Sequence, residues 1–163
     1  FSSVNHISDS RNLEYMLQYL RERGNLEFGP NMIKAAGFAV VYTPEQQKMI
    51  DQIAKLFADA GFEPPLADEV CAAFKDKNAA RQLLYSMAEE GLITRIGPDG
   101  FIHTASLNEA LDYIKQTIRS EGAVTLAQVR DRMNTSRKYA LAVLDYCDAI
   151  KLTRLVDDRR IFY

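Results

Sequence analysis

The sequence has little of the chemistry on which most enzymes and metal sites depend. Its 163 residues include no tryptophan, two histidines and two cysteines. His6 and His103 lie in different parts of the chain, and the zinc-ligand spacings Cys-x-x-Cys and His-x-x-x-His do not occur. The phosphate-binding loops Gly-x-x-x-x-Gly-Lys and Gly-x-Gly-x-x-Gly are also missing. We therefore expect a protein that is not an enzyme and holds no metal or other cofactor.

Long apolar runs are missing as well. No stretch approaches the length of a membrane-spanning helix, so no membrane partner is expected. The chain starts at Phe1 without an initiator methionine or a signal-peptide pattern, which suggests a piece of a longer, cytoplasmic protein. Cys71 and Cys147 each lie in an apolar helical pattern. The sequence therefore predicts two buried free thiols, as is usual in a reducing compartment.

Positive charge is scarce overall but concentrated near the C-terminus. The formal net charge is −2. Residues 1–105 carry ten basic and fourteen acidic groups, a net of −4, whereas residues 106–163 carry ten basic and eight acidic groups, a net of +2. Eight of the twenty Lys and Arg residues lie between Arg130 and Arg160. Nucleic-acid binding is therefore expected only locally, in the C-terminal third.

Capping motifs and apolar spacing indicate two similar sets of elements. Thr43–Gln46, Ser106–Glu109 and Thr125–Gln128 each pair Ser or Thr with Gln or Glu three residues later, as in a capping box. Each set is predicted to consist of a helix, a short helix, a third helix and a two-stranded hairpin. The expected elements are helices from Thr43, over 67–74 and over 78–90 with strands 92–96 and 101–103, then helices 106–121, 125–133 and 135–149 with strands 151–156 and 159–163.

This order of elements is that of a winged helix, a helix-turn-helix followed by a β-wing. We therefore predict a mainly α fold with small β-wings, arranged as tandem winged-helix domains. Residues 1–42 show a helix and strand-like pieces over 25–28 and 39–42, as in the C-terminal part of a preceding winged helix. The predicted domains are 1–42, 43–105, a spacer, and 106–163, the binding domain.

The third helix of the last set has an unusual beginning. Whether Asn134 or Thr135 is its N-cap, the third position is Arg137 or Lys138 rather than Gln or Glu. A cation there opposes the helix dipole at a cost of roughly 0.3–1 kcal/mol. A bound anion would reverse the sign, because backbone N–H groups, hydroxyls and cations would all face it. The sequence therefore predicts a phosphate site that includes Thr135, Ser136, Arg137 and Lys138.

The last hairpin carries further cations. Arg154 lies on one strand, and Arg159 and Arg160 lie on the other, on either side of the tip at Asp157 and Asp158. The wing of a winged helix lies beside the start of the third helix, so the cations of the helix start and the arginines of the hairpin could hold one phosphate backbone. Alternatively, the hairpin arginines pair with nearby aspartates. The candidate binding residues are Arg130, Thr135, Ser136, Arg137, Lys138, Arg154, Arg159 and Arg160.

The same stretch resembles the last winged helix of the SelB family, the bacterial selenocysteine-specific elongation factors. The resemblance is specific over about residues 124–162 and is architectural upstream, apart from a junction-like stretch from Gly37 to Gln46. The motifs that carry it are Val129-Arg130-Asp131, Thr135-Ser136-Arg137-Lys138-Tyr139-Ala140, Leu144-Asp145-Tyr146-Cys147-Asp148, Thr153-Arg154 and Asp158-Arg159-Arg160.

The resemblance implies that residues 106–163 bind the SECIS hairpin of selenoprotein mRNA and hold an elongation factor near a recoded UGA. Arg137 and Lys138 would meet RNA at the helix start, and the wing arginines would line its side. The ribosome, GTP and selenocysteyl-tRNA would bind through the full-length factor. Two positions depart from the family pattern: Leu155 replaces an arginine, and Asp157 replaces a glycine and adds a repelling charge.

Two other functions remain open from the residues alone. The same basic cluster would suit a DNA-binding winged-helix transcription regulator, because a winged helix can enter the major groove of duplex DNA. The acidic first 105 residues would suit a protein-interaction module with no nucleic-acid role.

Overall fold

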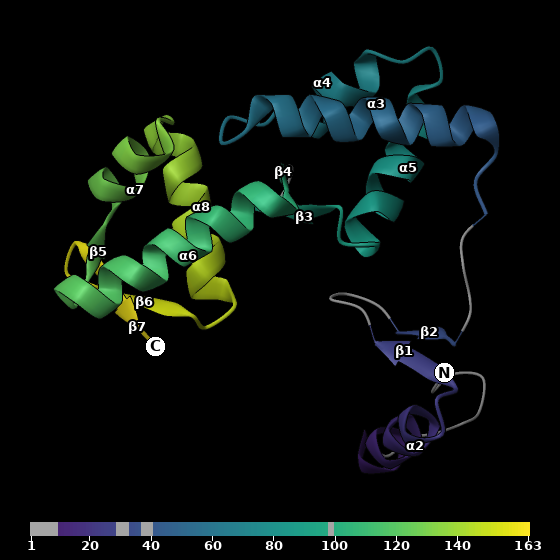
Figure 1. Ribbon diagram of the computed structural model, residues 1–163, viewed down its shortest axis with the longest axis horizontal. Coiled ribbons are helices and arrows are strands. Elements are labelled where there is room, and N and C mark those ends of the chain that lie inside the picture. Colours follow the sequence, from purple (N-terminus) through teal and green to yellow (C-terminus); the bar gives the residue numbers. More distant parts are fainter. Residues whose placement is uncertain (1–9, 29–32, 37–40, 98–99) are drawn as a thin grey trace. The chain divides into compact units, whose positions relative to one another are not determined.

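The chain is mainly helical, with small antiparallel sheets (Figure 1). The computed structural model describes residues 10–28, 33–36, 41–97 and 100–163. They belong to two compact units, Phe1–Tyr42 and Thr43–Tyr163. The predicted fold class, mainly α with small β-wings, is confirmed. No helix in the described part of the chain combines the length and the apolarity needed to cross a bilayer.

The described residues of the first unit form a helix and a hairpin. Helix α2 (Ser10–Glu22) is followed by β1 (Leu26–Phe28) and β2 (Ile33–Ala35), which pair antiparallel. The strand predicted over 39–42 is wrong: residues 39 and 40 lie outside the described residues, and 41 and 42 are not in a strand. Position 28 pairs with position 33, so four residues connect the strands, an ordinary hairpin length. The partner strand therefore comes earlier than predicted.

The second unit begins with a helix closed by a capping box at Thr43. The Thr43 hydroxyl accepts from the Gln46 N–H at 3.2 Å, and the Gln46 side-chain oxygen accepts from the Thr43 N–H at 2.9 Å. Both backbone donors are thus satisfied at the helix start, as predicted. The first set of elements is α3 (Pro44–Ala60), α4 (Ala67–Ala72), α5 (Lys77–Glu89), β3 (Ile93–Arg95) and β4 (Phe101–His103).

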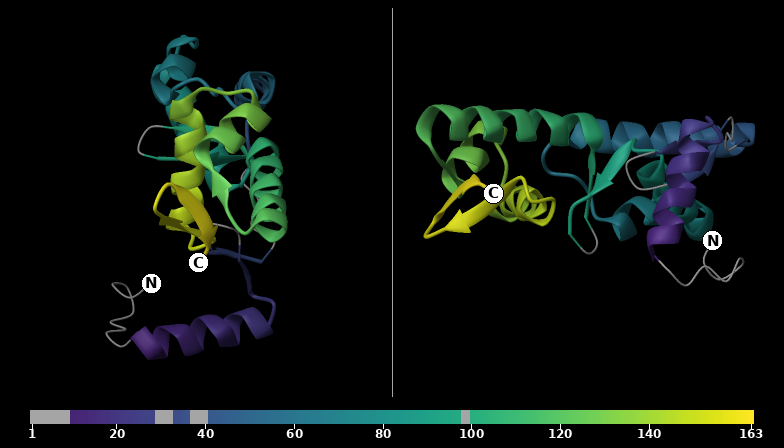
Figure 2. Two further views of the ribbon diagram at one scale, coloured as in Figure 1. Left: turned by 90° about the vertical axis from the view of Figure 1, so that its left-hand side faces the viewer. Right: turned by 90° about the horizontal axis from the view of Figure 1, so that it is seen from below.

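The second set repeats this order and adds a strand. The added strand is β5 (Val124–Thr125), which lies between the first two helices and is not predicted from the sequence. It pairs with the last strand, β7 (Arg159–Phe162), and makes a three-stranded sheet of order β5-β7-β6. In both views of Figure 2 the last hairpin lies beside α8, which it contacts through β6. The set comprises α6 (Thr104–Glu121), β5 (Val124–Thr125), α7 (Leu126–Met133), α8 (Arg137–Ala149), β6 (Thr153–Val156) and β7 (Arg159–Phe162).

The start of α6 differs from the sequence prediction. The capping box expected at Ser106 does not open the helix, because α6 already begins at Thr104. His103, the last residue of β4, is the N-cap, and its Nδ1 accepts from the Ala105 N–H at 3.3 Å. Ser106 therefore lies inside the first turn. Strand β4 consequently continues into α6 without a linker between the two sets.

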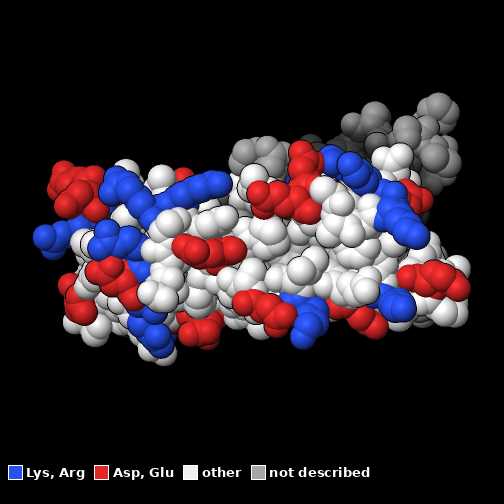
Figure 3. Space-filling view, turned by 90° about the horizontal axis from the view of Figure 1, so that it is seen from above, with Lys and Arg blue, Asp and Glu red and all other residues white. Residues whose placement is uncertain are grey.

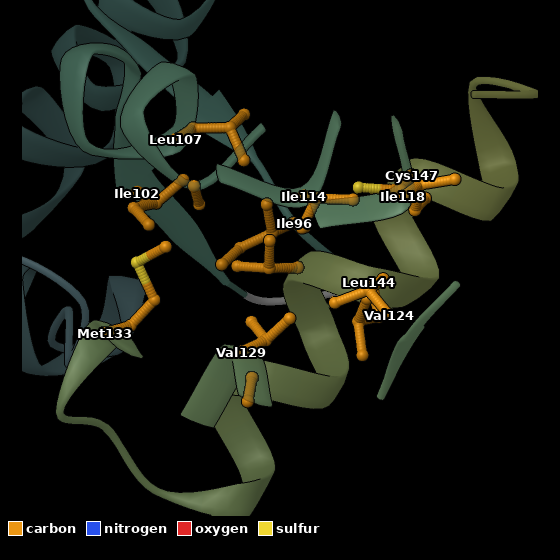
Figure 4. Close-up of a cluster of buried hydrophobic side chains, with 13 residues drawn as sticks. Ile96, Ile102, Leu107, Ile114, Ile118, Val124, Val129, Met133, Leu144 and Cys147 are labelled. Carbon is orange, nitrogen blue, oxygen red and sulfur yellow. The ribbon is translucent and has the colours of Figure 1, made fainter. Parts of the chain in front are cut away.

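The two sets share one apolar core. Ile96 and Ile102, from the hairpin region of the first set, are buried in the same cluster as side chains of α6, α7 and α8. Figure 4 shows both isoleucines among residues of the second set, including Ile114 and Val129. Burial of such side chains contributes roughly 1.5–3 kcal/mol each. This shared core explains why residues 43–163 form one compact unit.

Both cysteines are buried free thiols, as predicted. Cys147 lies in the shared core on α8. Burial, with the nearby Asp148 carboxylate adding to it, raises the pKa of the Cys147 thiol from 9.0 to about 12. The folded protein therefore holds this thiol in its protonated form through the neutral and mildly alkaline range.

The raised pKa of Cys147 predicts a loss of stability in alkali. The neutral thiol favours the folded state below pH 9.0, and this contribution disappears as the pH rises through about 12, because the unfolded chain releases the proton first. Urea unfolding at pH 8 and at alkaline pH, compared between the natural chain and Cys147→Ala, measures it. The stability difference between the two proteins should shrink as the pH rises; a constant difference would contradict the shifted pKa.

Candidate nucleic-acid interface

Helix α8 begins two residues later than the sequence predicts. Its N-cap is Ser136, whose side chain makes no capping hydrogen bond with any described residue. Asn134 instead ends α7 in the left-handed conformation, with φ 48°. Arg137 and Lys138 therefore take the first two helical positions, and Tyr139 takes the third. Both cations remain at the helix start, but the prediction of a cation at the third position is wrong, because Tyr139 lies there.

A loop of the first set contacts the start of α8. Thr135 donates its hydroxyl proton to the Phe62 carbonyl at 2.9 Å, and Tyr139 donates to the Pro64 carbonyl at 3.0 Å. The Ser136 N–H donates to Glu63 Oε1 at 2.9 Å.

Glu63 therefore supplies the anion that was expected from a ligand. Its carboxylate lies where the partial positive charge of the helix N-terminus favours a negative group. The Thr135 hydroxyl and the Ser136 N–H are both engaged within the chain. The sequence does not predict this contact, because residues more than seventy positions apart carry no local signal of pairing. The Thr135 hydroxyl and the Ser136 N–H are therefore not free to meet a ligand, and the exposed basic side chains at this helix end are those of Arg137 and Lys138.

Arg137 and Lys138 are exposed at this helix end. The guanidinium of Arg137 makes no hydrogen bond or ion pair with any residue in the described ranges. The Lys138 ammonium lies 5.3 Å from the centre of the Tyr139 ring, a cation–π contact. Such a contact leaves the ammonium able to donate hydrogen bonds. Both cations are therefore available to a phosphate backbone.

The wing presents two arginines on its outer face. Val156 lies opposite Arg159, and Arg154 lies two residues before Val156, so Arg154 and Arg159 share one face of the hairpin. Arg154 is exposed and has no ion pair with the described residues. The Arg159 side chain is 65% exposed, and its Nε lies 3.7 Å from Asp158 Oδ1. A surface pair of this kind contributes little and is readily exchanged.

Arg160 faces the other way. Its side chain is 8% exposed, and its guanidinium pairs with Asp145 at 3.2 Å and with Asp148 at 3.4 Å. Adjacent residues of a strand point to opposite faces, so the position of Arg160 next to the outward Arg159 already contained this signal. Arg160 is thus a buried link between the wing and α8.

Arg130 is the remaining candidate residue. Its guanidinium forms a close pair with the neighbouring Asp131, at 2.7 Å from Nη2 and 2.8 Å from Nε. Both side chains are exposed. The structure thus places Arg130 on the surface of α7 with a carboxylate partner.

The wing tip explains one departure from the family pattern. Asp157 has φ 54°, in the left-handed region that glycine adopts without strain. Aspartate tolerates this conformation better than most residues, so the backbone is retained while a negative charge is added. Leu155, at the other departure, is 53% exposed and lies opposite Arg160.

A groove of about 710 Å³ adjoins this surface. It is lined by Pro64 and Pro65 of the loop, by the hairpin region of the first set, and by α8 residues that include Tyr139 and Tyr146. Burial raises the pKa of Tyr146. The two tyrosines therefore line the groove between the sets.

The charge of the surface is local. Figure 3 shows one face of the molecule, on which lysine and arginine side chains lie among acidic ones rather than in one continuous patch. Among the described residues, no three His, Cys, Asp or Glu side chains come together as a metal site. The arrangement can therefore hold phosphates at a few points.

Comparisons with known proteins agree with this geometry. Residues 116–162 match the family model described as elongation factor SelB, winged helix. The selenocysteine-specific elongation factor of Escherichia coli (strain K12) is 28% identical over 143 residues, which are 85% of this chain and 22% of that protein. That of Desulfomicrobium baculatum is 20% identical over 153 residues, 91% of this chain and 24% of that protein. The chain thus spans about a quarter of the length of these relatives.

Solved structures show the same likeness. The mRNA-binding domain of elongation factor SelB from E. coli, in complex with SECIS RNA, matches with a TM-score of 0.63 and 28% identity, covering 74% of this chain and 98% of that chain. A bacterial selenocysteine-specific elongation factor, EF-Sec, matches with a TM-score of 0.58 and 15% identity, covering 95% of this chain and 26% of that chain, and shows the fold alone.

The contact of Glu63 with α8 predicts a measurable contribution to stability. Glu63→Ala should lower the free energy of unfolding by about 1 kcal/mol, because the Ser136 N–H loses its acceptor and the helix start loses a favourable charge. Urea denaturation measures the change, and Glu109→Ala, at an exposed position of α6, is the matched control. Equal stability of the two variants would contradict the role of the carboxylate.

Proposed function

We propose that this C-terminal winged-helix region of SelB binds the SECIS hairpin of selenoprotein mRNA through residues 106–163, and so tethers the elongation factor at a recoded UGA. The observation that carries the proposal is the pairing of two outward cations at the start of α8 with two on the outer face of the wing. The likeness to a SelB domain in complex with SECIS RNA supports it.

The candidate residues take different roles in this proposal. Arg137, Lys138, Arg154 and Arg159 contact phosphates directly, because their charged groups face solvent. Arg130 can join them when its exposed pair with Asp131 opens. Thr135 and Ser136 act indirectly, by holding the helix start against the loop that carries Glu63.

RNA suits this surface better than duplex DNA. The loop around Glu63 contacts the start of α8, so this helix end is not free to enter the groove of a duplex. The deep, narrow major groove of A-form RNA excludes a helix in any case, and hairpins are recognised through their backbones, loops and unpaired bases. A few point contacts from a helix start and a wing match that mode of recognition.

The remaining roles belong to the whole factor. We propose that the region is a binding module without enzymatic activity or cofactor, and that it acts in the cytoplasm. GTP, selenocysteyl-tRNA and the ribosome would be bound through other parts of the full-length factor.

Binding of three nucleic acids tests the proposed function. The chain is titrated against a SECIS-type hairpin, the same stem as an uninterrupted RNA duplex, and a DNA duplex of equal length, at two salt concentrations. The proposal expects the hairpin to bind most tightly. Preference for DNA would favour a transcription regulator, and binding of none at moderate salt would favour a protein-interaction module.

Removal of one helix-start cation should weaken hairpin binding. Arg137→Ala is expected to cost roughly 1–3 kcal/mol of binding free energy and to lower the salt dependence by about one phosphate contact. Arg81→Ala on α5 is the control, because Arg81 already pairs with Asp68, which raises its pKa. Titrations at several salt concentrations give both quantities. An unchanged dissociation constant for Arg137→Ala would remove Arg137 from the interface.

Removal of the wing-tip charge should have the opposite effect. Asp157→Asn keeps a residue that tolerates the left-handed backbone and deletes a negative charge beside the wing arginines. Hairpin binding should tighten by about two- to fivefold, with the gain largest at low salt. Asp51→Asn, at an exposed site in the middle of α3, is the control for net charge alone. Equal tightening in both variants would show that the position of Asp157 is unimportant.

A further inference from the structure

Arg160 stands apart from the other basic residues of the wing. Its side chain is 8% exposed, whereas that of Arg159 is 65% exposed. Its two polar contacts go to carboxylates one helical turn apart on α8, Asp145 and Asp148. Arg160 therefore binds the recognition helix of its own domain rather than facing a ligand.

Asp148 connects both strands of the hairpin to α8. One carboxylate oxygen accepts from the Thr153 hydroxyl on β6 at 2.6 Å, and the other accepts from Arg160 on β7 at 3.4 Å. Thr153 is also buried. Arg160 lies opposite Leu155 on β6 and opposite Val124 on β5. Arg160 thus pairs through its backbone with β5 and β6 and binds α8 through its guanidinium.

This junction determines where the outward cations lie. Arg154 and Arg159 are on the face of the hairpin opposite Arg160, while Arg137 and Lys138 are at the start of the helix to which Arg160 is bound. A rotation of the hairpin on α8 would move the two wing arginines relative to the two cations at the start of α8. A phosphate backbone held at both points requires a fixed separation between them.

We propose that Arg160 is a positioning residue for RNA binding: it makes no contact with RNA, and it fixes the wing on α8 so that the wing cations and the helix-start cations engage one backbone together. The inference rests on the proposed function. The cost of desolvating a buried ion pair offsets much of the attraction between its two charges. A gain in net stability alone therefore does not account for an arginine at position 160.

The chemistry of the side chain supports a positioning role. A guanidinium is a planar fork that can donate to two carboxylates at once, whereas an ammonium is a single point charge. Arg160→Lys therefore keeps the charge of the wing but weakens the double link to Asp145 and Asp148. This substitution separates the position of the wing from its charge.

Double-mutant cycles on the full chain test the inference. Hairpin affinity is measured for Arg154→Ala and Arg137→Ala, each in the natural chain and in Arg160→Lys, after thermal unfolding has confirmed that every variant is folded. Arg154→Ala is expected to weaken binding about tenfold in the natural chain and less than about threefold in Arg160→Lys. The cost of Arg137→Ala should be the same in both backgrounds. A merely structural Arg160 would not single out Arg154.

The outcomes separate the two claims. If the natural chain does not bind the hairpin, the proposed function fails and the inference falls with it. If the hairpin binds but Arg154→Ala costs the same factor in both backgrounds, only the inference is overturned. An Arg160→Lys variant that binds like the natural chain overturns it as well.

A second variant serves if Arg160→Lys does not fold. The Asp145 side chain is 60% exposed, so Asp145→Asn should be tolerated while it weakens one of the two links to Arg160 by removing its negative charge. Loss of a negative charge would by itself tighten RNA binding. The positioning role expects the reverse, about threefold weaker binding. Unchanged or tighter binding would overturn the inference.

Discussion

Burial of Ile96 and Ile102 in the core built by α6, α7 and α8 is the constraint on which the rest of the second unit depends. These side chains come from the hairpin region of the first set, so the core of the second set is complete only when both sets are folded together. The uninterrupted passage from β4 into α6 then leaves no slack between them. Under that constraint the loop around Glu63 reaches α8, and its carbonyls and carboxylate accept hydrogen bonds from residues at the start of that helix.

The basic surface follows from two local rules once this frame is in place. The late start of α8 puts Arg137 and Lys138 in the first helical turn, where they project beside a helix end already occupied by a carboxylate. Strand alternation sends Arg159 outward and Arg160 inward. The basic residues of the wing are thus of two kinds: Arg154 and Arg159 can contact a ligand, whereas Arg160 links the wing to α8.

Much of this could be predicted from the sequence, because it depends on local patterns. The capping boxes at Thr43 and Thr125 and the order of helices and wings are correct. The box at Ser106 failed because His103 offers an earlier cap directly after a strand. The partnership of Glu63 with Ser136 could not be predicted, since it depends on how the two sets pack. The inward direction of Arg160 could have been inferred from strand alternation and from aspartates spaced three apart on α8.

The shared core also has a consequence for how such a region can change over evolutionary time. The two winged helices are not independent units: the core of the second includes apolar side chains of the first, and a carboxylate of the first accepts a hydrogen bond at the start of α8. An exchange of either domain for a distant homologue would leave an open patch and an unsatisfied helix end. The pair is therefore expected to be inherited, duplicated or lost as a single block, with sequence drift in one partner compensated in the other.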